Sequence, residues 1–423
     1  MDETVDSIGA KIADLRRRHA ETLSLTPQAE IIQVLSALAN RWRDPSYPLR
    51  LEAETWTEPF PFLMVQVSLD ALLDSLTPDA LGKLIAAENV SEELGYPVIG
   101  HVIAGNTPLL AWVSIIRALL VRSASLVKLP SNASARWADA FRRSLAEVAP
   151  AIAACVAFAE WLGGTTELDA ALCAQSDLVI AHGSDATLEA LRALCPPRAP
   201  FVGYGHRVSF GLVLPDADRE EAALCFAKDI LLYDQGGCLS PQTLHVISTF
   251  GDAKRFSAIL ADALAAACAK YPLPIRAASA PGAVLEARAL ALMEENTRVW
   301  IDAKQRWTVI ARPQSTWRGS PTYGVVSVQP LLSLQDLPEA VAGVAGRLQG
   351  CAVAGDFAGY LPGVSYLCKP GMMQAPPLNW RQDGRDVLRV LLPAKHQGSP
   401  KAPMIGGARE EFVGGAACRT LPL

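Results

Sequence analysis

The sequence predicts an α/β protein built around a parallel sheet, and three observations lead to this class. Short apolar runs alternate with amphipathic helical patterns, at the spacing of βαβ units, over about residues 97–204. The apolar runs are continuous rather than alternating, which fits strands that are covered on both faces. Half of the 423 residues are apolar and 19% are charged, a composition that excludes wholesale disorder.

The expected elements follow in order along the chain. Residues 1–95 are rich in helical patterns and carry no chemical motif. The strands expected next are 97–104, 125–130, 154–161, 177–181 and 201–204. The helices expected between them are 107–122, 134–147, 166–174 and 184–194. This alternation predicts the first domain.

A second region is expected to begin near Val208, because the length of the chain favours two or three domains. The expected helices are 217–232, 252–270 and 337–348, and the expected strands are 243–248, 307–311 and 325–328. After Gly350 the chain is rich in Gly and Pro, and residues 373–392 show no clear periodicity.

Composition excludes several classes of partner. The formal net charge is −5 and there is no basic stripe, which argues against nucleic acid. The nine cysteines contain no C-x-x-C pair and the histidines show no metal-ligand spacing, so we expect no metal site. The charged N-terminal region is unlike a secretory signal, and no apolar run reaches the ~18 residues of a spanning helix. We therefore expect a cytoplasmic protein without a membrane span.

The sharpest local feature is the segment Asp234-Gln235-Gly236-Gly237-Cys238-Leu239-Ser240-Pro241. Glycines let backbone approach a substrate closely, and a cysteine on such a loop can expose its sulfur. Its backbone N–H can also face a bound carbonyl oxygen. The alternative is that Cys238 is a small buried apolar residue, as we expect for most of the other cysteines.

Further candidates lie where predicted strands lead into helices. Asn106, in Ala104-Gly105-Asn106-Thr107-Pro108, has an amide that can donate to an oxyanion, or else it caps the helix that follows.

Three more such turns suit a nucleotide. Ala181-His182-Gly183-Ser184-Asp185 and Gly163-Gly164 offer small residues and N–H groups for a pyrophosphate, although neither matches G-x-G-x-x-G. Lys128, at a strand end before Pro130-Ser131-Asn132, suits a ribose or phosphate. The alternatives are ordinary capped turns and a solvated strand end.

Taken in order, these segments resemble those of the aldehyde dehydrogenase superfamily. GHVIAGNTPLL stands where that family has a P-W-N-F-P-type turn, and LVKLP stands where it has a strand ending in L-K-P. Residues 163–164, 181–184 and 236–238 then match its glycine-rich turn, its F-T-G-S turn and its G-Q-x-C loop. Order and spacing agree over about residues 95–250, which is more specific than any single segment.

Three stretches resemble one branch of that superfamily, the LuxC-type acyl-CoA reductases. They are YGHRVSF at 204–210, DQGGCLSPQ at 234–242 and MQAPPLNWRQDG at 373–384. Aldehyde dehydrogenases that make acids carry a Glu in an E-L-G-G-K strand, which activates the water that hydrolyses the acyl-enzyme. Tyr204-Gly205-His206-Arg207 stands there without a carboxylate. Its absence suits an enzyme whose thioester must not be hydrolysed.

The resemblance implies an aldehyde dehydrogenase-like fold in three parts. Residues 1–207 would form a Rossmann-like NAD(P)-binding domain with a helical N-terminal region. Residues 208–395 would form an α/β catalytic domain, and 396–423 a segment between domains or subunits. The implied reaction reduces an acyl thioester with NAD(P)H to an aldehyde. Cys238 would be the nucleophile, with its thiolate favoured by helix N-terminal N–H groups. The Asn106 amide and the Cys238 N–H would hold the oxyanion.

The resemblance also implies cofactor contacts and partners. Lys128 and Ser131 would contact the adenosine, and Gly164, Gly183 and Ser184 the pyrophosphate and nicotinamide. Ser131 stands near the Glu of many NAD-preferring relatives and would not repel a 2′-phosphate, which favours NADPH over NADH. The E-x-F-G-P motif that holds the nicotinamide ribose is replaced by Pro321-Thr322-Tyr323-Gly324. The implied partners are acyl-CoA or another acyl thioester, with a fatty acyl group expected, an acyl-protein synthetase or acyl carrier protein, and further copies of the chain.

Two alternatives remain at this point. One is an aldehyde dehydrogenase that runs toward the acid, which the missing Glu argues against. The other, from a different class, is a catalytically silent subunit that scaffolds an acyl-transfer complex, with the motif-poor residues 1–95 as its docking surface.

Overall fold

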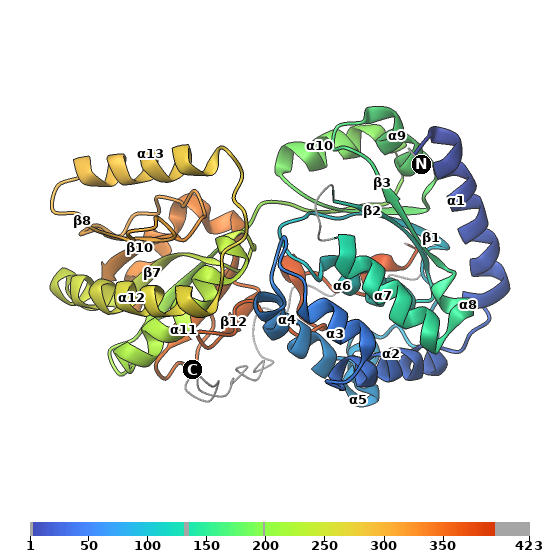
Figure 1. Cartoon of the computed structure of the whole chain (residues 1–423), viewed down its shortest axis with the longest axis horizontal. Coiled ribbons are helices and arrows are strands. Elements are labelled where there is room, and N and C mark those ends of the chain that lie inside the picture. The colour runs from blue at the N-terminus through green and yellow to red at the C-terminus, as the bar shows by residue number, and fades with distance from the viewer. Residues whose placement is uncertain (1–2, 131–134, 198, 394–423) are drawn as a thin grey trace. The chain divides into compact units, whose positions relative to one another are not determined.

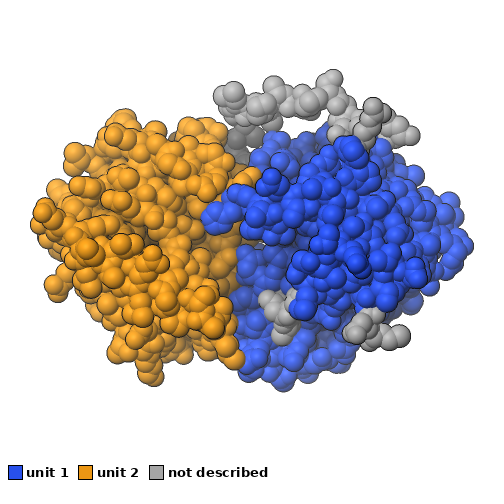
Figure 2. Space-filling model, turned by 90° about the horizontal axis from the view of Figure 1, so that it is seen from above, with its two compact units in different colours: residues 1–206, 377–406 blue, residues 207–376, 407–423 orange. Residues whose placement is uncertain are grey.

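The structure is a computed structural model that describes residues 3–130, 135–197 and 199–393. These residues form two compact units, shown in different colours in Figure 2. Unit 1 takes residues up to His206 and also residues 377–393, and unit 2 takes Arg207–Pro376. Residues 377–393 therefore pack with the first unit, although the sequence predicts them as part of the second domain, 208–395. The predicted segment 396–423 lies outside the described residues.

Unit 1 begins with helices, as the sequence predicts. They are α1 (Val5–Arg18), the π-helical turn η1 (His19–Leu23), α2 (Gln28–Arg43), α3 (Pro48–Glu54), α4 (Phe62–Asp74) and α5 (Pro78–Glu88). Thr4 caps α1 with a reciprocal pair of hydrogen bonds to Ser7, and Thr77 caps α5 by accepting from the Ala80 N–H.

Five strands and the helices between them complete unit 1. The strands are β1 (Val98–Val102), β2 (Ala124–Leu129), β3 (Val156–Glu160), β4 (Leu178–His182) and β5 (Phe201–Tyr204). The helices are α6 (Leu110–Leu120), α7 (Ala135–Val148), α8 (Pro150–Ala153), α9 (Thr166–Gln175) and α10 (Asp185–Leu194). All strand pairs are parallel in the order β3-β2-β1-β4-β5, so the order reverses between β1 and β4. Such a switch point is where open α/β sheets bind ligands.

Helices cover both faces of this sheet, with α9 and α10 on one face and α6 and α7 on the other (Figure 1). This explains why β1, β2 and β4 are buried along their whole length and read as continuous apolar runs.

Unit 2 contains a sheet of seven strands. The strands are β6 (Val208–Val213), β7 (Pro241–Ile247), β8 (Arg298–Ile301), β9 (Thr308–Ala311), β10 (Val325–Leu331), β11 (Leu348–Ala354) and β12 (Tyr366–Cys368). Their order is β12-β11-β6-β7-β10-β9-β8, and only β8 runs antiparallel to its neighbour.

The helical elements of unit 2 lie between these strands. They are α11 (Arg219–Leu231), η2 (Leu232–Gln235), α12 (Phe250–Lys270), α13 (Ala280–Met293), η3 (Leu334–Asp336), α14 (Leu337–Ala340) and η4 (Ala342–Arg347). Strands β8, β11 and β12 and helix α13 were not predicted. The helix predicted at 337–348 is wrong beyond Ala340. Gly343 and Gly346 disfavour a continued α-helix there, and the chain enters β11 at Leu348.

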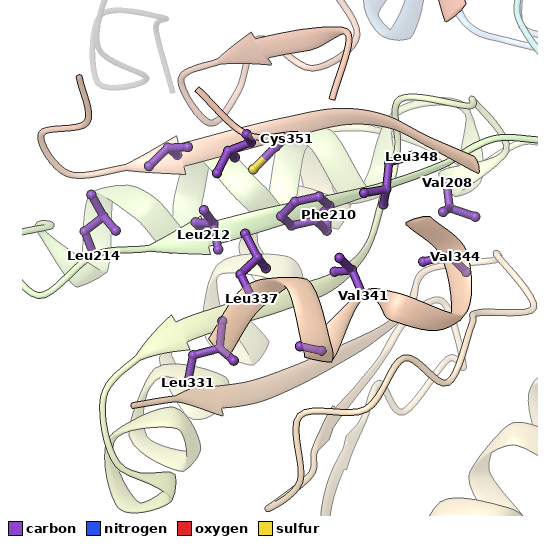
Figure 3. Close-up of a cluster of buried hydrophobic side chains, with 13 residues drawn as sticks. Val208, Phe210, Leu212, Leu214, Leu331, Leu337, Val341, Val344, Leu348 and Cys351 are labelled. Carbon is purple, nitrogen blue, oxygen red and sulfur yellow. The ribbon is translucent and has the colours of Figure 1, made fainter. Parts of the chain in front are cut away.

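One face of the unit 2 sheet packs under α14 and η4. Phe210 and Leu212 on β6 and Cys351 on β11 meet Leu337 and Val341 there (Figure 3). The Phe210 side chain is fully buried, and truncating a ring of this kind to Ala costs about 3–5 kcal/mol of stability. This core holds β6 firmly, and β6 in turn positions the candidate nucleophile loop described next.

Candidate active site

Cys238 lies in a turn between η2 and β7, within unit 2. Its side chain is half-buried, whereas the other cysteines with a free thiol among the described residues are buried. The Ser240 N–H closes the turn on the Gly237 carbonyl at 2.9 Å. The turn leads into strand β7, and a strand after Cys238 is what the sequence predicts.

The approach to this turn has an unusual backbone. Tyr233, Asp234 and Gln235 have φ of 57°, 51° and 63°, which is the left-handed region for three consecutive non-glycine residues. Each such residue costs on the order of 1–3 kcal/mol and persists only where its surroundings fix it.

An ion pair and a side-chain amide hold the left-handed segment Tyr233–Gln235 in place. Arg276 donates two hydrogen bonds of 2.7 Å to the Asp234 carboxylate, and the Tyr323 N–H donates to the Asp234 carbonyl at 3.1 Å. Gln235 donates to the Pro241 and Val325 carbonyls at 2.8 and 3.0 Å. Burial raises the pKa of the Asp234 carboxyl and the Arg276 bonds oppose that rise.

The two sides of the Cys238 turn are held by residues distant in sequence. Ser209, on β6, donates a 2.8 Å hydrogen bond to the Cys238 carbonyl and accepts one of 3.0 Å from the Gly350 N–H. Gln374 donates a 2.9 Å hydrogen bond to the Ser240 hydroxyl. Ser209, Ser240 and Gln374 all belong to unit 2, as Cys238 does.

This geometry brings together the three stretches that resemble the acyl-CoA reductases. Ser209 comes from YGHRVSF, Cys238 from DQGGCLSPQ and Gln374 from MQAPPLNWRQDG. Sequence reasoning singled out these stretches but assigned no role to Ser209 or Gln374, and it missed the Asp234–Arg276 pair. The resemblance of these stretches to the family was the sequence signal that could have pointed to Ser209 and Gln374.

Unit 1 collects those of the other predicted residues that the structure describes along one edge of its sheet. Val102 on β1 pairs with Lys128 on β2 and lies beside Ala181 on β4, while Lys128 pairs with Ala159 on β3. The turns that follow these strands carry Asn106, Gly164, Gly183 and Ser184. All therefore lie at the carboxyl edge of the parallel sheet, where such folds bind ligands.

Asn106 does not cap a helix. It is exposed in the turn after β1, and α6 begins only at Leu110, with Leu109 at the cap position and no side-chain cap bond. The alternative role as an N-cap is therefore wrong. Asn106 belongs to unit 1 and Cys238 to unit 2, and their shared oxyanion site stays a prediction.

The glycine turns differ in how they use their residues. Gly164 has φ of 86°, and a methyl group placed on Gly163 or Gly164 would meet nothing within 4 Å, so their backbone is open to a ligand. Ser184 caps α10 by accepting from the Thr187 N–H at 3.2 Å. Gly183 precedes it, and a methyl group there would lie 3.2 Å from the Thr187 side chain.

Lys128 precedes Leu129 on β2, and Leu129 lines an open hollow at the ends of β2 and β3. The Lys128 side chain is buried, which lowers the pKa of its amine, and Nζ lies 5.7 Å from the centroid of the Trp161 ring. The hollow measures about 630 Å³, and its lining includes Leu129, Arg136 and Glu160. Ser131 lies outside the described residues. A switch point between β1 and β4, an open glycine turn and a buried lysine at the same edge of the sheet fit an adenine dinucleotide.

The stretch Tyr204–Arg207 carries no carboxylate of its own, but a carboxylate from another element contacts it. Asp185, in the first turn of α10, accepts a 3.1 Å hydrogen bond from the backbone N–H of His206. A methyl group on Gly205 would contact the same carboxylate oxygen. The exposed His206 is therefore held through its backbone, and sequence reasoning placed Asp185 in a capped turn without predicting this contact.

Two absences concern the described residues. No helix in the described ranges has the length and apolarity needed to cross a membrane. Among these same residues, no group of three or more His, Cys, Asp or Glu side chains is arranged to hold a metal ion.

The fold is that of the aldehyde dehydrogenases. Succinic semialdehyde dehydrogenase from Streptococcus pyogenes, solved with NADP+, matches with a TM-score of 0.65 at 16% identity, over 84% of this chain and 83% of that chain. An NAD-dependent aldehyde dehydrogenase from Sinorhizobium meliloti matches with a TM-score of 0.64 at 17% identity, over 84% and 76%. The predicted fold class is confirmed.

Within that fold the chain belongs to the family described as acyl-CoA reductase (LuxC), which matches residues 25–393. It is 30% identical over 148 residues to a long-chain acyl-protein thioester reductase of Photorhabdus laumondii, covering 34% of this chain and 31% of that protein. It is 26% identical over 243 residues to long-chain acyl-protein thioester reductase 2 of Photobacterium leiognathi, covering 52% and 50%. The matches thus span about a third to a half of these relatives. The predicted family is confirmed.

Proposed function

We propose that this chain reduces an acyl thioester to the aldehyde with NAD(P)H, through an acyl-enzyme on Cys238. The observation that carries the proposal is the half-buried Cys238, in a turn held by Ser209 on one side and Gln374 on the other, in a member of the acyl-CoA reductase family. The names of the relatives point to a long-chain acyl group.

Acyl transfer to Cys238 is the first step of this mechanism. The thiolate attacks the thioester carbonyl carbon and forms a carbon–sulfur bond. The Asn106 amide and the Cys238 N–H stabilise the oxyanion, and one such donor is worth about 2.7–4 kcal/mol of barrier. The bond to the carrier sulfur then breaks, and the carrier leaves as a thiol after taking up a proton.

The reductive step uses the edge of the unit 1 sheet. Lys128 and Ser131 would hold the adenosine, and Gly164, Gly183 and Ser184 the pyrophosphate and nicotinamide. When bound, the nicotinamide supplies the hydride that converts the acyl group to aldehyde and restores the Cys238 thiol. In total, one thioester, one NAD(P)H and one proton give one aldehyde, one thiol and one NAD(P)+. We propose NADPH as the preferred form, because Ser131 carries no charge to repel a 2′-phosphate.

Reduction rather than hydrolysis is supported by the stretch Tyr204–Arg207, which lacks a carboxylate. The Asp185 carboxylate that meets it accepts the His206 N–H, a contact that orients backbone.

The wider setting is part of the same proposal. Unit 1 would bind the cofactor, and unit 2 would carry the acyl group. The acyl donor would be acyl-CoA, an acyl carrier protein or an acylated partner enzyme. The enzyme itself would be a homo-oligomer in the cytoplasm.

Nicotinamide absorbance during incubation with acyl-CoAs of increasing chain length tests the proposal, with NADPH and NADH in separate series. The aldehyde is trapped as a hydrazone. Cys238→Ala is the test variant, and Cys268→Ala on α12 is the matched control, because Cys268 is a buried thiol of another element.

We expect cofactor oxidation with one aldehyde per NADPH, lost in Cys238→Ala and retained in Cys268→Ala. Acid formed from aldehyde and NAD(P)+ alone would instead support an acid-forming dehydrogenase. No turnover with any free or protein-bound acyl thioester, in a chain that still forms a complex with an acyl-transfer enzyme, would support the silent scaffold.

A further inference from the structure

The segment that follows β12 returns to the Cys238 turn. The side chain of Gln374, in this segment, lies beside both ends of that turn, Gly237 and Ser240. The Gln374 amide nitrogen donates to the Ser240 hydroxyl at 2.9 Å. A methyl group placed on Gly237 would lie 2.9 Å from the Gln374 amide oxygen and 3.4 Å from its nitrogen. Gly237 and Ser240, on either side of Cys238 and Leu239, therefore both lie beside one buried amide.

Gln374 is itself fixed by two elements of unit 2. Asp229, on α11, accepts hydrogen bonds from the Gly371 N–H at 2.6 Å and the Met373 N–H at 3.1 Å. The Tyr366 hydroxyl, on β12, donates to the Met372 carbonyl at 2.9 Å. The backbone on the N-terminal side of Gln374 is thus anchored to a helix and to a strand, which makes the side chain a rigid support.

The contact also accounts for the second glycine of the motif. Gly237 does not have a positive φ, so its backbone conformation is open to other residues. A side chain there would require the Gln374 amide oxygen, at the end of its side chain, to shift from its 2.9 Å position. The same amide donates to the Ser240 hydroxyl through its nitrogen, so such a shift would disturb that hydrogen bond.

We propose that Gln374 is a positioning residue for the nucleophile, which sets the backbone of Gly237 and Cys238. It would thereby orient the Cys238 thiol and the Cys238 N–H that the proposed mechanism uses as an oxyanion donor. This rests on the proposed function in one respect, namely that Cys238 is the nucleophile. Misplacing a reacting group by about an ångström can cost as much as a hundredfold in rate.

A double-mutant cycle between Gly237 and Gln374 tests the contact. The variants are Gly237→Ala, Gln374→Ala and the pair together, and Gln374→Met keeps the side-chain volume while removing the hydrogen bond. Gln28→Ala is the matched control, because Gln28 is a buried glutamine of unit 1 that donates to the Leu120 carbonyl at 2.8 Å. Gly82→Ala is the glycine control, since a methyl group there meets nothing within 4 Å.

Two readouts are needed, because a purely structural residue would change stability alone. The first is kcat and KM for acyl-CoA reduction. The second is the rate of Cys238 alkylation by iodoacetamide as a function of pH, followed by peptide mass, which needs neither cofactor nor acyl substrate.

We expect Gly237→Ala, Gln374→Ala and Gln374→Met each to lower kcat by about ten- to a hundredfold, with KM changed less than about threefold. Each should also shift the pH profile of Cys238 alkylation. The double variant should lose no more than the worse single variant, because Gln374→Ala removes the atoms that Ala at position 237 would strike. Gln28→Ala and Gly82→Ala should keep both readouts at wild-type values.

Fully multiplicative losses in the double variant would overturn the proposal, and so would wild-type kcat and alkylation in Gln374→Met. The two readouts separate this proposal from the proposed function. If the wild type reduces no acyl thioester, or if Cys238→Ala stays active, the proposed function fails, while the alkylation cycle still decides whether Gln374 positions the Cys238 turn.

Discussion

The Ser209 hydroxyl donates a 2.8 Å hydrogen bond to the carbonyl oxygen of Cys238. Ser209 lies on β6 opposite Pro241, the first residue of β7, so the strand pairing places its side chain beside the turn. The same hydroxyl accepts from the Gly350 N–H at 3.0 Å. The fully buried Ser209 on β6 therefore links the Cys238 turn to strand β11.

Truncating this serine should disturb the turn and weaken unit 2. Ser209→Ala leaves the Cys238 carbonyl and the Gly350 N–H without that partner, and an unsatisfied buried group costs about 1–3 kcal/mol. We expect a loss of stability of this size in urea unfolding, together with a kcat reduced by about tenfold. Ser257→Ala is the control, because Ser257 is equally buried and bonds only the Ala253 carbonyl of its own helix. It should leave kcat unchanged, and a kcat equally reduced in both variants would contradict this account.

The Asp234–Arg276 pair should stabilise the left-handed segment before Cys238. The Asp234 side chain is buried and that of Arg276 partly buried, so removing one partner should cost less than the ~3–5 kcal/mol of a fully buried pair. Arg276→Gln should cost more than Asp234→Asn, because Arg276 also donates to the Gln305, Arg306 and Tyr323 carbonyls. Urea unfolding measures both losses.

The double variant of this pair should lose less than the sum of the two single losses. Arg41→Gln, which breaks the exposed pair with Glu147, serves as control and should cost less than about 1 kcal/mol. Additive losses at Asp234 and Arg276 would show that the pair does not act as a unit.

Asp229 should make stability depend on pH. Burial raises the pKa of its carboxyl to about 7, while the hydrogen bonds from Gly371 and Met373 oppose that rise. In the unfolded chain the carboxyl titrates near about 4. The folded state therefore holds the proton more tightly, and its contribution to stability is fully present below about pH 4 and is lost as the pH rises through about 7.

Comparison with Asp229→Asn isolates this contribution. The difference in urea stability between wild type and variant should favour the wild type most at the acid end, fall between about pH 4 and 7 and level off above. A difference that stays constant over this range, or that grows with pH, would refute the role of Asp229.

Lys128 should contribute to cofactor binding, which can be measured without turnover. Lys128→Met keeps the apolar stem and removes the charge at the edge of the unit 1 sheet. We expect NADPH and NADH to bind about tenfold more weakly, as read from the fluorescence of the reduced nicotinamide. Lys254→Met, at a lysine over the Phe250 ring in unit 2, is the control. Unchanged binding in Lys128→Met would remove this residue from the proposed site.

The first unit was predictable because each strand there is a continuous apolar run bounded by turn residues. β1, β2 and β4 were all expected, and the turns with Asn106, Gly164 and Ser184 follow from that order. The boundaries failed where local signals compete. Pro108 suggested an early start for α6, and the structure keeps that segment as a turn up to Leu109.

The supports of Cys238 were not predictable, because they come from pairings distant in sequence. Ser209 and Gly350 are 141 residues apart and Gln374 and Ser240 are 134 apart. Strand β12 has three residues, too few for a periodic pattern, and it lies next to β11 only through the sheet. The three stretches that resemble the acyl-CoA reductases marked the right segments. Which of their side chains bond to one another could be determined only from the fold.

The mass of the chain after exposure to a long-chain acyl-CoA, with no nicotinamide present, tests the central claim most directly. The account predicts the addition of one acyl group, located by peptide mapping on Cys238, removed by hydroxylamine and discharged as aldehyde when NADPH is added. Cys238→Ala should gain no mass, and Cys268→Ala should be labelled like the wild type. An acyl group found on another residue, or aldehyde formed by Cys238→Ala, would contradict the account.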